Sequence, residues 1–120
     1  MNIEGKIWGS TSEIFNKNNV RINRAIIERG YKCSEHCHPN SYNMFFVESG
    51  LIEVHRKKED YDLVDVTLLD GCQSCIVPPG EYHHFIGLAQ TSVVYEIYWV
   101  ELTNDINRID CGGPVCNKER

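Results

Sequence analysis

The sequence lacks several features that would place it in a common class of protein. None of its apolar runs approaches the ~18 residues that cross a bilayer. No stretch repeats apolar residues at the helical spacing i, i+3, i+4, i+7 over three turns, so a helical domain is not expected. Positive charge is not in excess, because 12 Lys and Arg stand against 17 Asp and Glu, a net charge of −5. This balance argues against nucleic acid or an anionic membrane as a partner.

Residues 1–10 have neither the basic segment nor the apolar segment of a secretory signal. We therefore expect a cytoplasmic protein whose six cysteines are reduced thiols. Cys72 and Cys75 form a Cys-x-x-Cys pair, but residues three apart on a strand point to opposite faces, which disfavours one shared ion. Metal buffering or redox chemistry by the cysteines is a minor alternative. Alkylation of the thiols without loss of bound metal would count against it.

The sequence does contain a series of short β-rich segments, which are separated by turn signals. Its hydrophobic content of 42% is enough for a core, and its length suits one domain. The turns are marked by Ser49-Gly50, by the charged residues 57–60, by Asp70-Gly71 and by residues 78–80. We predict strands at residues 6–9, 20–28, 31–38, 42–48, 51–56, 62–69, 72–77, 83–87 and 91–102.

This many short strands in a small chain predicts an all-β sandwich or barrel, and the succession of hairpins suits a double-sheet jelly roll. We expect a single domain over residues 1–120, with its core at about 20–102. An edge strand and a polar loop at residues 16–19 should precede the core. A polar C-terminal tail should follow it at residues 103–120.

The most informative residues are the five histidines. His36 and His38 are two residues apart, which on a strand places both imidazoles on one face. Two neutral imidazoles in this position can chelate a divalent ion, although such a pair alone is more often a surface feature. His84 directly follows His83 and should face the other way on a strand. His55 lies close to a charged hairpin tip and is expected to be solvated.

A wider pattern surrounds these histidines. Its first part consists of Gly30, His36, His38, Asn43 and Gly50, which are separated in turn by five, one, four and six residues. Its second part consists of Gly71, Pro78, Gly80 and His83, which are separated in turn by six, one and two residues. The two parts strongly resemble the two signature motifs of the cupin superfamily. Those motifs are Gly-x5-His-x-His-x3-or-4-Glu-x6-Gly and Gly-x5-Pro-x-Gly-x2-His-x3-Asn.

The resemblance implies a double-stranded β-helix, which is a jelly-roll barrel of the cupin type, with one mononuclear metal site. It makes His36, His38 and His83 the ligands of one divalent ion. Iron is the first expectation for that ion, with Mn, Ni, Co or Zn as alternatives. Cupin barrels usually pair through a sheet edge or face, so the resemblance also implies a homodimer. Met44 and Phe46, which should point outward, are candidates for its interface.

The sequence departs from the family pattern in two places. Asn43 stands where the family has a glutamate ligand, and its neutral amide leaves the double charge of the ion uncompensated. We therefore expect weaker metal retention and a preference for an anionic ligand, while Asn43 ligates weakly or orients the substrate or a bound water. The second motif has one extra residue before Pro78, which suggests a bulge, and Gly87 replaces its terminal asparagine.

Alternation along the strands assigns residues to the substrate pocket. Phe45 and Val47 share the strand face of Asn43, and Phe85 shares the face of His83. We expect Asn43, Phe45, Val47 and Phe85 to line the pocket. Their apolar side chains would keep bulk water away from the ion.

Glu96 and Tyr98 are the candidate catalytic residues on the last strand. Either could act as an acid or base if the register of that strand turns it inward, and Tyr98 could equally be a core residue. Cys33, Glu35 and Cys37 alternate with the histidine ligands and should face away from the pocket.

The function expected from these features is that of a small metalloprotein that binds and transforms a small, anionic metabolite. Dioxygenase, isomerase and lyase chemistry are all compatible with such a site. The alternative is a non-catalytic module that binds a sugar or an acid, because a fold alone does not settle its chemistry. Metal-dependent turnover would separate the two. A small molecule is the expected partner, and neither nucleic acid nor a membrane is.

Overall fold

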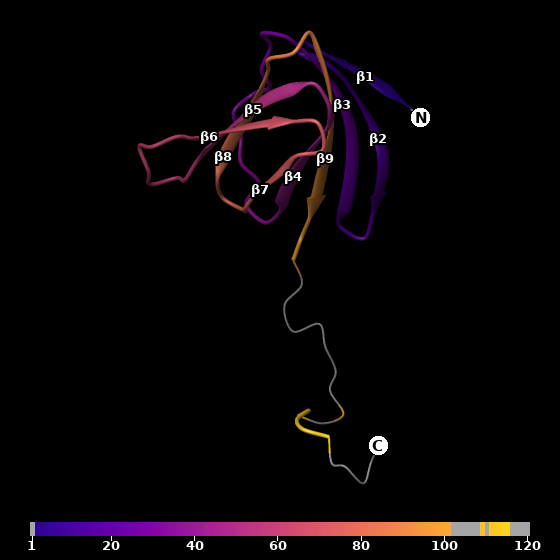
Figure 1. The fold of residues 1–120 in the computed structure, drawn as a ribbon, viewed down its shortest axis with the longest axis vertical. Helices are drawn as coiled ribbons and strands as arrows, with labels where there is room; N and C mark the ends of the chain where they lie inside the picture. The colour runs from indigo at the N-terminus through magenta and orange to yellow at the C-terminus, as the bar shows by residue number, and fades with distance from the viewer. Residues whose placement is uncertain (1, 102–108, 110, 116–120) are drawn as a thin grey trace.

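The computed structural model describes residues 2–101, 109 and 111–115, and β-strands dominate this part of the chain (Figure 1). The strands are β1 (Ile3–Lys6), β2 (Gly9–Lys17), β3 (Val20–Glu28), β4 (Tyr42–Ser49), β5 (Leu51–Lys57), β6 (Asp65–Asp70), β7 (Ser74–Val77), β8 (Tyr82–Gly87) and β9 (Thr91–Trp99). They form a six-stranded sheet in the order β1-β2-β3-β9-β4-β7 and a three-stranded sheet in the order β6-β5-β8. The predicted all-β fold class is confirmed. Among the described residues no helix is long and apolar enough to cross a membrane.

The core consists of the inward-facing side chains of both sheets, as in other two-sheet folds. Burial alternates along β4, where Asn43, Phe45 and Val47 are buried and the residues between them are half-buried. Branched and aromatic side chains suit such a pleated, half-buried surface. The fully or almost fully buried apolar residues include Ala25, Ile27, Phe45, Val47, Ile52, Val54, Phe85 and Val94.

Two predicted strands differ from the observed ones. Residues 31–38 form no regular strand and make only two isolated bridges, Lys32 with Ile86 and His36 with His83. Residues 6–9, predicted as one strand, contain the end of β1, a two-residue turn and the start of β2. The strand β2 itself is not predicted, because its polar sequence shows no clear alternation. The large sheet therefore starts at Ile3, before the expected core limit at residue 20. Residue 102, the expected end of the last strand, and most of the 103–120 tail lie outside the described residues.

The outer face of the large sheet carries a row of apolar side chains. Cross-strand pairing places Phe15, Ile22, Ile97, Met44 and Ile76 side by side over β2, β3, β9, β4 and β7. The row is partly open to solvent, since Phe15 is 43% and Ile76 is 46% exposed. Burying such a face is the physical motive for the predicted homodimer, which stays a prediction.

Replacing Met44 with glutamate tests this dimer. A twofold contact over the row would bring two added carboxylates close together in an apolar surrounding, which costs several kcal/mol at an effective dielectric of ~20. We expect the Met44→Glu chain to elute as a monomer in light-scattering chromatography and the unmodified chain as a dimer. Val66→Glu, at an exposed position on the smaller sheet, is the control and should stay dimeric. A monomeric unmodified chain would contradict the prediction.

Candidate metal centre

Three histidines from two segments of the chain meet at one point. His36 and His38 come from the loop before β4, and His83 lies in β8. Their ring centroids are 4.6 Å apart for His36 and His83, 5.0 Å for His36 and His38, and 5.4 Å for His38 and His83. One ring nitrogen from each lies within 4.8 Å of the other two. The structure thus brings together the three residues that the sequence motifs select, in a group compatible with a divalent metal site.

Backbone hydrogen bonds hold the two segments together. The N–H of His36 donates to the carbonyl of His83 at 3.1 Å, and the N–H of His83 donates to the carbonyl of His36 at 2.9 Å. The N–H of Gly80 donates to the carbonyl of His38 at 2.9 Å. Gly80 has a φ of 84°, a left-handed conformation that glycine adopts without strain. The turn before β8 therefore fixes both histidine segments without help from an ion.

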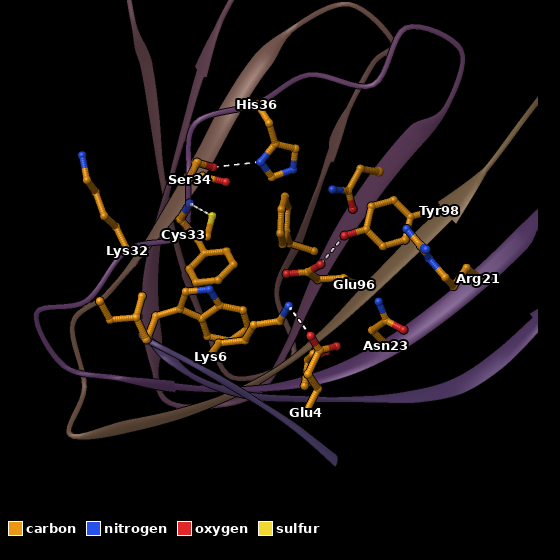
Figure 2. A pocket seen from close by; sticks show the side chains of 16 residues that line it. Glu4, Lys6, Arg21, Asn23, Lys32, Cys33, Ser34, His36, Glu96 and Tyr98 are labelled. Carbon is orange, nitrogen blue, oxygen red and sulfur yellow. Dashed lines mark hydrogen bonds and ion pairs between the residues drawn. The ribbon is translucent and has the colours of Figure 1, made fainter. Parts of the chain in front are cut away.

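The ring nitrogens of two histidines are oriented by carbonyl groups. His36 Nδ1 donates to the carbonyl of Ser34 at 2.8 Å, as Figure 2 shows, and His83 Nδ1 donates to the carbonyl of Glu81 at 3.1 Å. A carbonyl can only accept, so Nδ1 carries the proton in both rings and Nε2 keeps its lone pair. Metal-binding imidazoles are usually held by such an outer hydrogen bond, which fixes their tautomer.

Two buried polar atoms beside His83 fit a cation. Asn43 is 1% exposed, and its Nδ2 lies 3.2 Å from His83 Nε2. Asn43 Oδ1 and His38 Nε2 are buried and have no hydrogen-bond partner among the described residues. Such atoms are costly unless something binds them. An ion among the histidines would bind His38 Nε2 directly, and a rotated Asn43 amide would turn its oxygen to the same point. The donor set therefore fits a metal.

Burial favours the neutral form of two of the candidate ligands, His38 and His83. It lowers the pKa of His83 to about 4. Burial also lowers the pKa of His38, and the neighbouring His36 adds to this effect. A neutral imidazole is the form that binds a metal, so His38 and His83 need not lose a proton before binding at neutral pH.

A cavity of about 520 Å³ reaches the three-histidine group at His36, which is the member of the group that lines it (Figure 2). Its size is in the range of small-molecule sites. His36, Asn43, Phe45 and Phe85 line it, whereas Val47 is fully buried in the core and does not. The other lining residues are Glu4, Lys6, Ile7, Trp8, Thr11, Arg21, Asn23, Lys32, Cys33, Ser34, Glu96 and Tyr98.

The register of β9 turns Glu96 and Tyr98 into this cavity. Glu96 lies between Phe45 of β4 and Asn23 of β3, both of which also line the cavity. The Tyr98 hydroxyl donates a hydrogen bond to the Glu96 carboxylate. Burial raises the pKa of the Glu96 carboxyl, against the opposing effects of this hydrogen bond and of nearby positive charge. Burial and the Glu96 charge raise the pKa of Tyr98. The two side chains form a hydrogen-bonded acidic pair that faces the cavity.

Cys33 lies on the cavity side, contrary to the prediction that it faces away. The isolated bridges around it explain the difference, because Lys32 pairs with Ile86 whereas His36 pairs with His83. His36 lies four positions after Lys32 in the sequence, whereas their bridge partners His83 and Ile86 are three positions apart. The extra residue between the bridges shifts the inward and outward alternation by one, which turns Cys33 toward the cavity. Burial raises the pKa of the Cys33 thiol to about 11, so it is a poor nucleophile. Glu35 and Cys37, the other two residues of that prediction, do not line the cavity.

The two remaining histidines lie on the outer face of the small sheet. His84 faces away from the cavity, as predicted, and stacks on His55 with ring centroids 4.6 Å apart. His55 is half-buried rather than fully solvated, and its Nε2 lies 2.8 Å from a carboxylate oxygen of Glu53. This pair belongs to the packing of β5 against β8, and it is separate from the three-histidine group.

The bulge predicted before Pro78 is absent from β7. The pairing of β7 with β4 runs from Asn43–Val77 to Phe46–Ser74 without a register shift. Cys72 lies ahead of β7, in the turn after β6, with a left-handed φ of 68°. The left-handed backbone therefore lies in the turn ahead of β7, and the strand itself is regular.

Sequence reasoning did not select Arg21 and Asn23, which also line the cavity. A signal for them exists in the sequence. They share the inward parity of Ala25 and Ile27 on β3, and both of these are fully buried. An inward strand face that changes from apolar to polar toward one end indicates the wall of a cavity rather than the core.

Comparison with protein-family models and with curated proteins gives no match. Solved structures do match the fold. KdgF from Halomonas sp. has a TM-score of 0.72 and 14% identity, over 85% of this chain and 90% of that one. The Schizosaccharomyces pombe Cnp3 cupin domain has a TM-score of 0.71 and 14% identity, over 84% of this chain and 69% of that one.

The capsular polysaccharide assembling protein CapF from Staphylococcus aureus is similar over a shorter part of its own length. Its TM-score is 0.77 and its identity 17%, over 87% of this chain but only 29% of the CapF chain. At such identities the likeness concerns the fold. The nine described strands, their two sheets and these likenesses agree, and the chain has the double-stranded β-helix fold of the cupin proteins.

Proposed function

We propose that the chain binds one divalent metal ion through His36, His38 and His83, and that it binds and converts a small anionic metabolite in the adjoining cavity. The observation that carries the proposal is the convergence of three ring nitrogens within 4.8 Å, next to a cavity that also holds the Glu96 carboxyl. Bound there, an ion would supply Lewis-acid or redox chemistry to the ligand.

The chain's own residues would bind the ligand and move its protons. Glu96, with its raised pKa and its hydrogen bond from Tyr98, is suited to accept or return a proton. Phe45 and Phe85 form an apolar wall, and both are almost fully buried. Asn43 would complete the metal site weakly or orient the ligand. Iron is our first choice of ion, and Mn, Ni, Co and Zn also suit imidazole ligands.

The metal-binding residues are all neutral, which favours a negatively charged ligand. Three imidazoles and an amide contribute no negative charge, so a divalent ion keeps its full charge in this site. An anion that binds the ion would neutralise part of it in a poorly solvated place. This argument supports an anionic metabolite over a neutral one.

Replacing Asn43 with aspartate tests its place beside the ion. A carboxylate about 4 Å from a cation gains about 4 kcal/mol per unit charge at an effective dielectric of ~20, of which desolvation cancels a part. We expect metal affinity to rise at least ~10-fold in competition with a chelator. The metal-free variant should lose roughly 1–3 kcal/mol of unfolding free energy, because a buried polar group lacks a suitable partner. Unchanged metal affinity would place Asn43 outside the site.

The function itself is tested by turnover. The metal-loaded chain would be mixed with a panel of small hydroxy and oxo carboxylic acids and followed by proton NMR. We expect conversion of at least one acid, which stops when a chelator removes the metal. Ligands that bind without conversion would support the alternative, a non-catalytic module for a sugar or an acid. That alternative is favoured by the likeness to CapF, which is described as a capsular polysaccharide assembling protein.

A further inference from the structure

We propose that Arg21 binds the carboxylate of the ligand, so that the cavity selects small carboxylic acids that also carry an oxygen donor for the metal. The inference rests on the proposed function and adds a specificity-determining residue to it. Arg21 lies on β3, in the inward register of Asn23 and Ala25. It is none of the residues that the cupin motifs select.

The position of Arg21 places a positive charge at the ligand space. Arg21 lines the main cavity together with Glu96 and Tyr98. It also lines two smaller hollows of about 260 and 190 Å³, the second of which it shares with His38 and Tyr98. Its guanidinium carbon lies 4.8 Å from the centroid of the Tyr98 ring, and Figure 2 shows the two side chains next to each other. The aromatic face orients the guanidinium and leaves its N–H groups available.

The guanidinium of Arg21 is free to take an anion. Among the described residues it makes no hydrogen bond and no ion pair. Arg24 on the outer face of the same strand differs, because its Nη2 lies 3.7 Å from a carboxylate oxygen of Glu48. Glu96, the acid that shares the cavity with Arg21, accepts the hydrogen bond from Tyr98. An arginine that faces a cavity without a carboxylate partner is suited to bind one from a ligand.

The other cations of the cavity are less suited to this task. Lys6 Nζ lies 3.0 Å from Glu4 Oε1, so its charge is already paired. Lys32 and Arg21 are both exposed, but the ammonium group of Lys32 makes only a point contact. The planar guanidinium of Arg21 can instead donate two parallel N–H bonds to one carboxylate.

Metal and arginine together define a ligand with two recognition points. Glu96 and Tyr98 line the same cavity as His36 and Arg21, so the hydrogen-bonded pair adjoins both binding groups. A ligand that places an oxygen on the ion and a carboxylate on Arg21 would therefore present its connecting atoms to Glu96. A neutral polyol of the same size could use only the first of these points.

The test compares matched ligands on matched variants. D-glucuronate and D-glucose differ mainly in one carboxylate, as do glycolate and ethylene glycol, and each would be titrated calorimetrically into the cobalt-loaded chain. We expect the acids to bind more tightly than their neutral partners. Arg21→Gln should weaken acid binding about 10–100-fold, the effect of losing a charge-assisted hydrogen bond. The acid affinity of Arg21→Lys should lie between those of Arg21→Gln and the unmodified chain. Arg24→Gln, on the opposite face of the strand, should bind the acids as tightly as the unmodified chain.

Metal content separates failure of this inference from failure of the proposed function. All these variants keep the three histidines, so cobalt should remain at one ion per chain. Two results obtained with a full cobalt content would overturn the role of Arg21 but not the metal site. One is acid binding that is unchanged in Arg21→Gln, and the other is no binding of acid to the unmodified chain at millimolar concentration. Failure of the unmodified chain to hold cobalt would overturn the proposed function, and with it this inference.

Discussion

Replacing His83 with alanine will remove the bound metal. His83 is 1% exposed, and its ring contacts both other histidines. Loss of an outer-sphere partner alone costs ~10–100-fold in metal affinity, so loss of a ligand should cost at least that much. We expect elemental analysis of chains purified without added metal to find close to one ion per unmodified chain and almost none per His83→Ala chain.

His84→Ala is the matched control for this experiment. His84 is the next residue in the chain and the same residue type, but it points away from the cavity and stacks on His55. Its loss should leave the metal content unchanged. Circular dichroism of both variants would show that the sheets are intact. Equal metal in His83→Ala and the unmodified chain would refute the assigned ligands, and a loss restricted to His84→Ala would move the site to the other face of the sheet.

The proposed function predicts that replacing Glu96 with glutamine abolishes most of the turnover while metal content stays the same. The amide keeps the size of the side chain but cannot take up a proton at neutral pH. General acid–base groups contribute about 10²–10⁴-fold to rates, so we expect kcat/KM for an identified substrate to fall by that factor. The measurement is the initial rate with the metal-loaded chain, beside elemental analysis of the same sample.

Glu96→Gln has a second readout that needs no substrate. The Glu96 charge helps to raise the pKa of Tyr98, after the larger effect of burial. Without this charge, Tyr98 should ionise at a lower pH, which ultraviolet titration of the phenol can follow against a Tyr98→Phe reference. Glu53→Gln, which alters a carboxylate beside His55 on the outer face, should change neither rate nor titration. Full turnover in Glu96→Gln would exclude Glu96 as the acid or base.

The three histidines could be predicted because their spacing resembles the two cupin motifs. The strand expected at residues 31–38 is not formed, so a shared strand face does not explain how His36 and His38 meet. Alternation did predict the buried face of β4, since Phe45 and Val47 must both face inward there. Val47 then belongs to the core and not to the cavity, because the cavity does not extend along the whole strand face.

The rest depends on pairings between distant segments, which one sequence does not specify. Cys33 turned toward the cavity because one extra residue separates the bridges at Lys32 and His36. The inward direction of Glu96 follows from its pairing with Phe45 across β4 and β9. Alternation within a strand leaves two directions open, and only the neighbouring strand selects one. The inward parity of Arg21 on β3 can be read from the sequence, but its approach to Tyr98 of β9 again depends on the pairing of distant strands.

X-ray absorption at the metal edge of the loaded chain tests the three-histidine site, because it identifies the ligand atoms themselves. We expect nitrogen or oxygen neighbours at about 2.0–2.2 Å, with the outer-shell scattering pattern of three imidazoles. The His83→Ala chain, if forced to take metal, should show fewer imidazoles. Sulfur neighbours at about 2.3 Å would instead place the ion on the cysteines and contradict the three-histidine site.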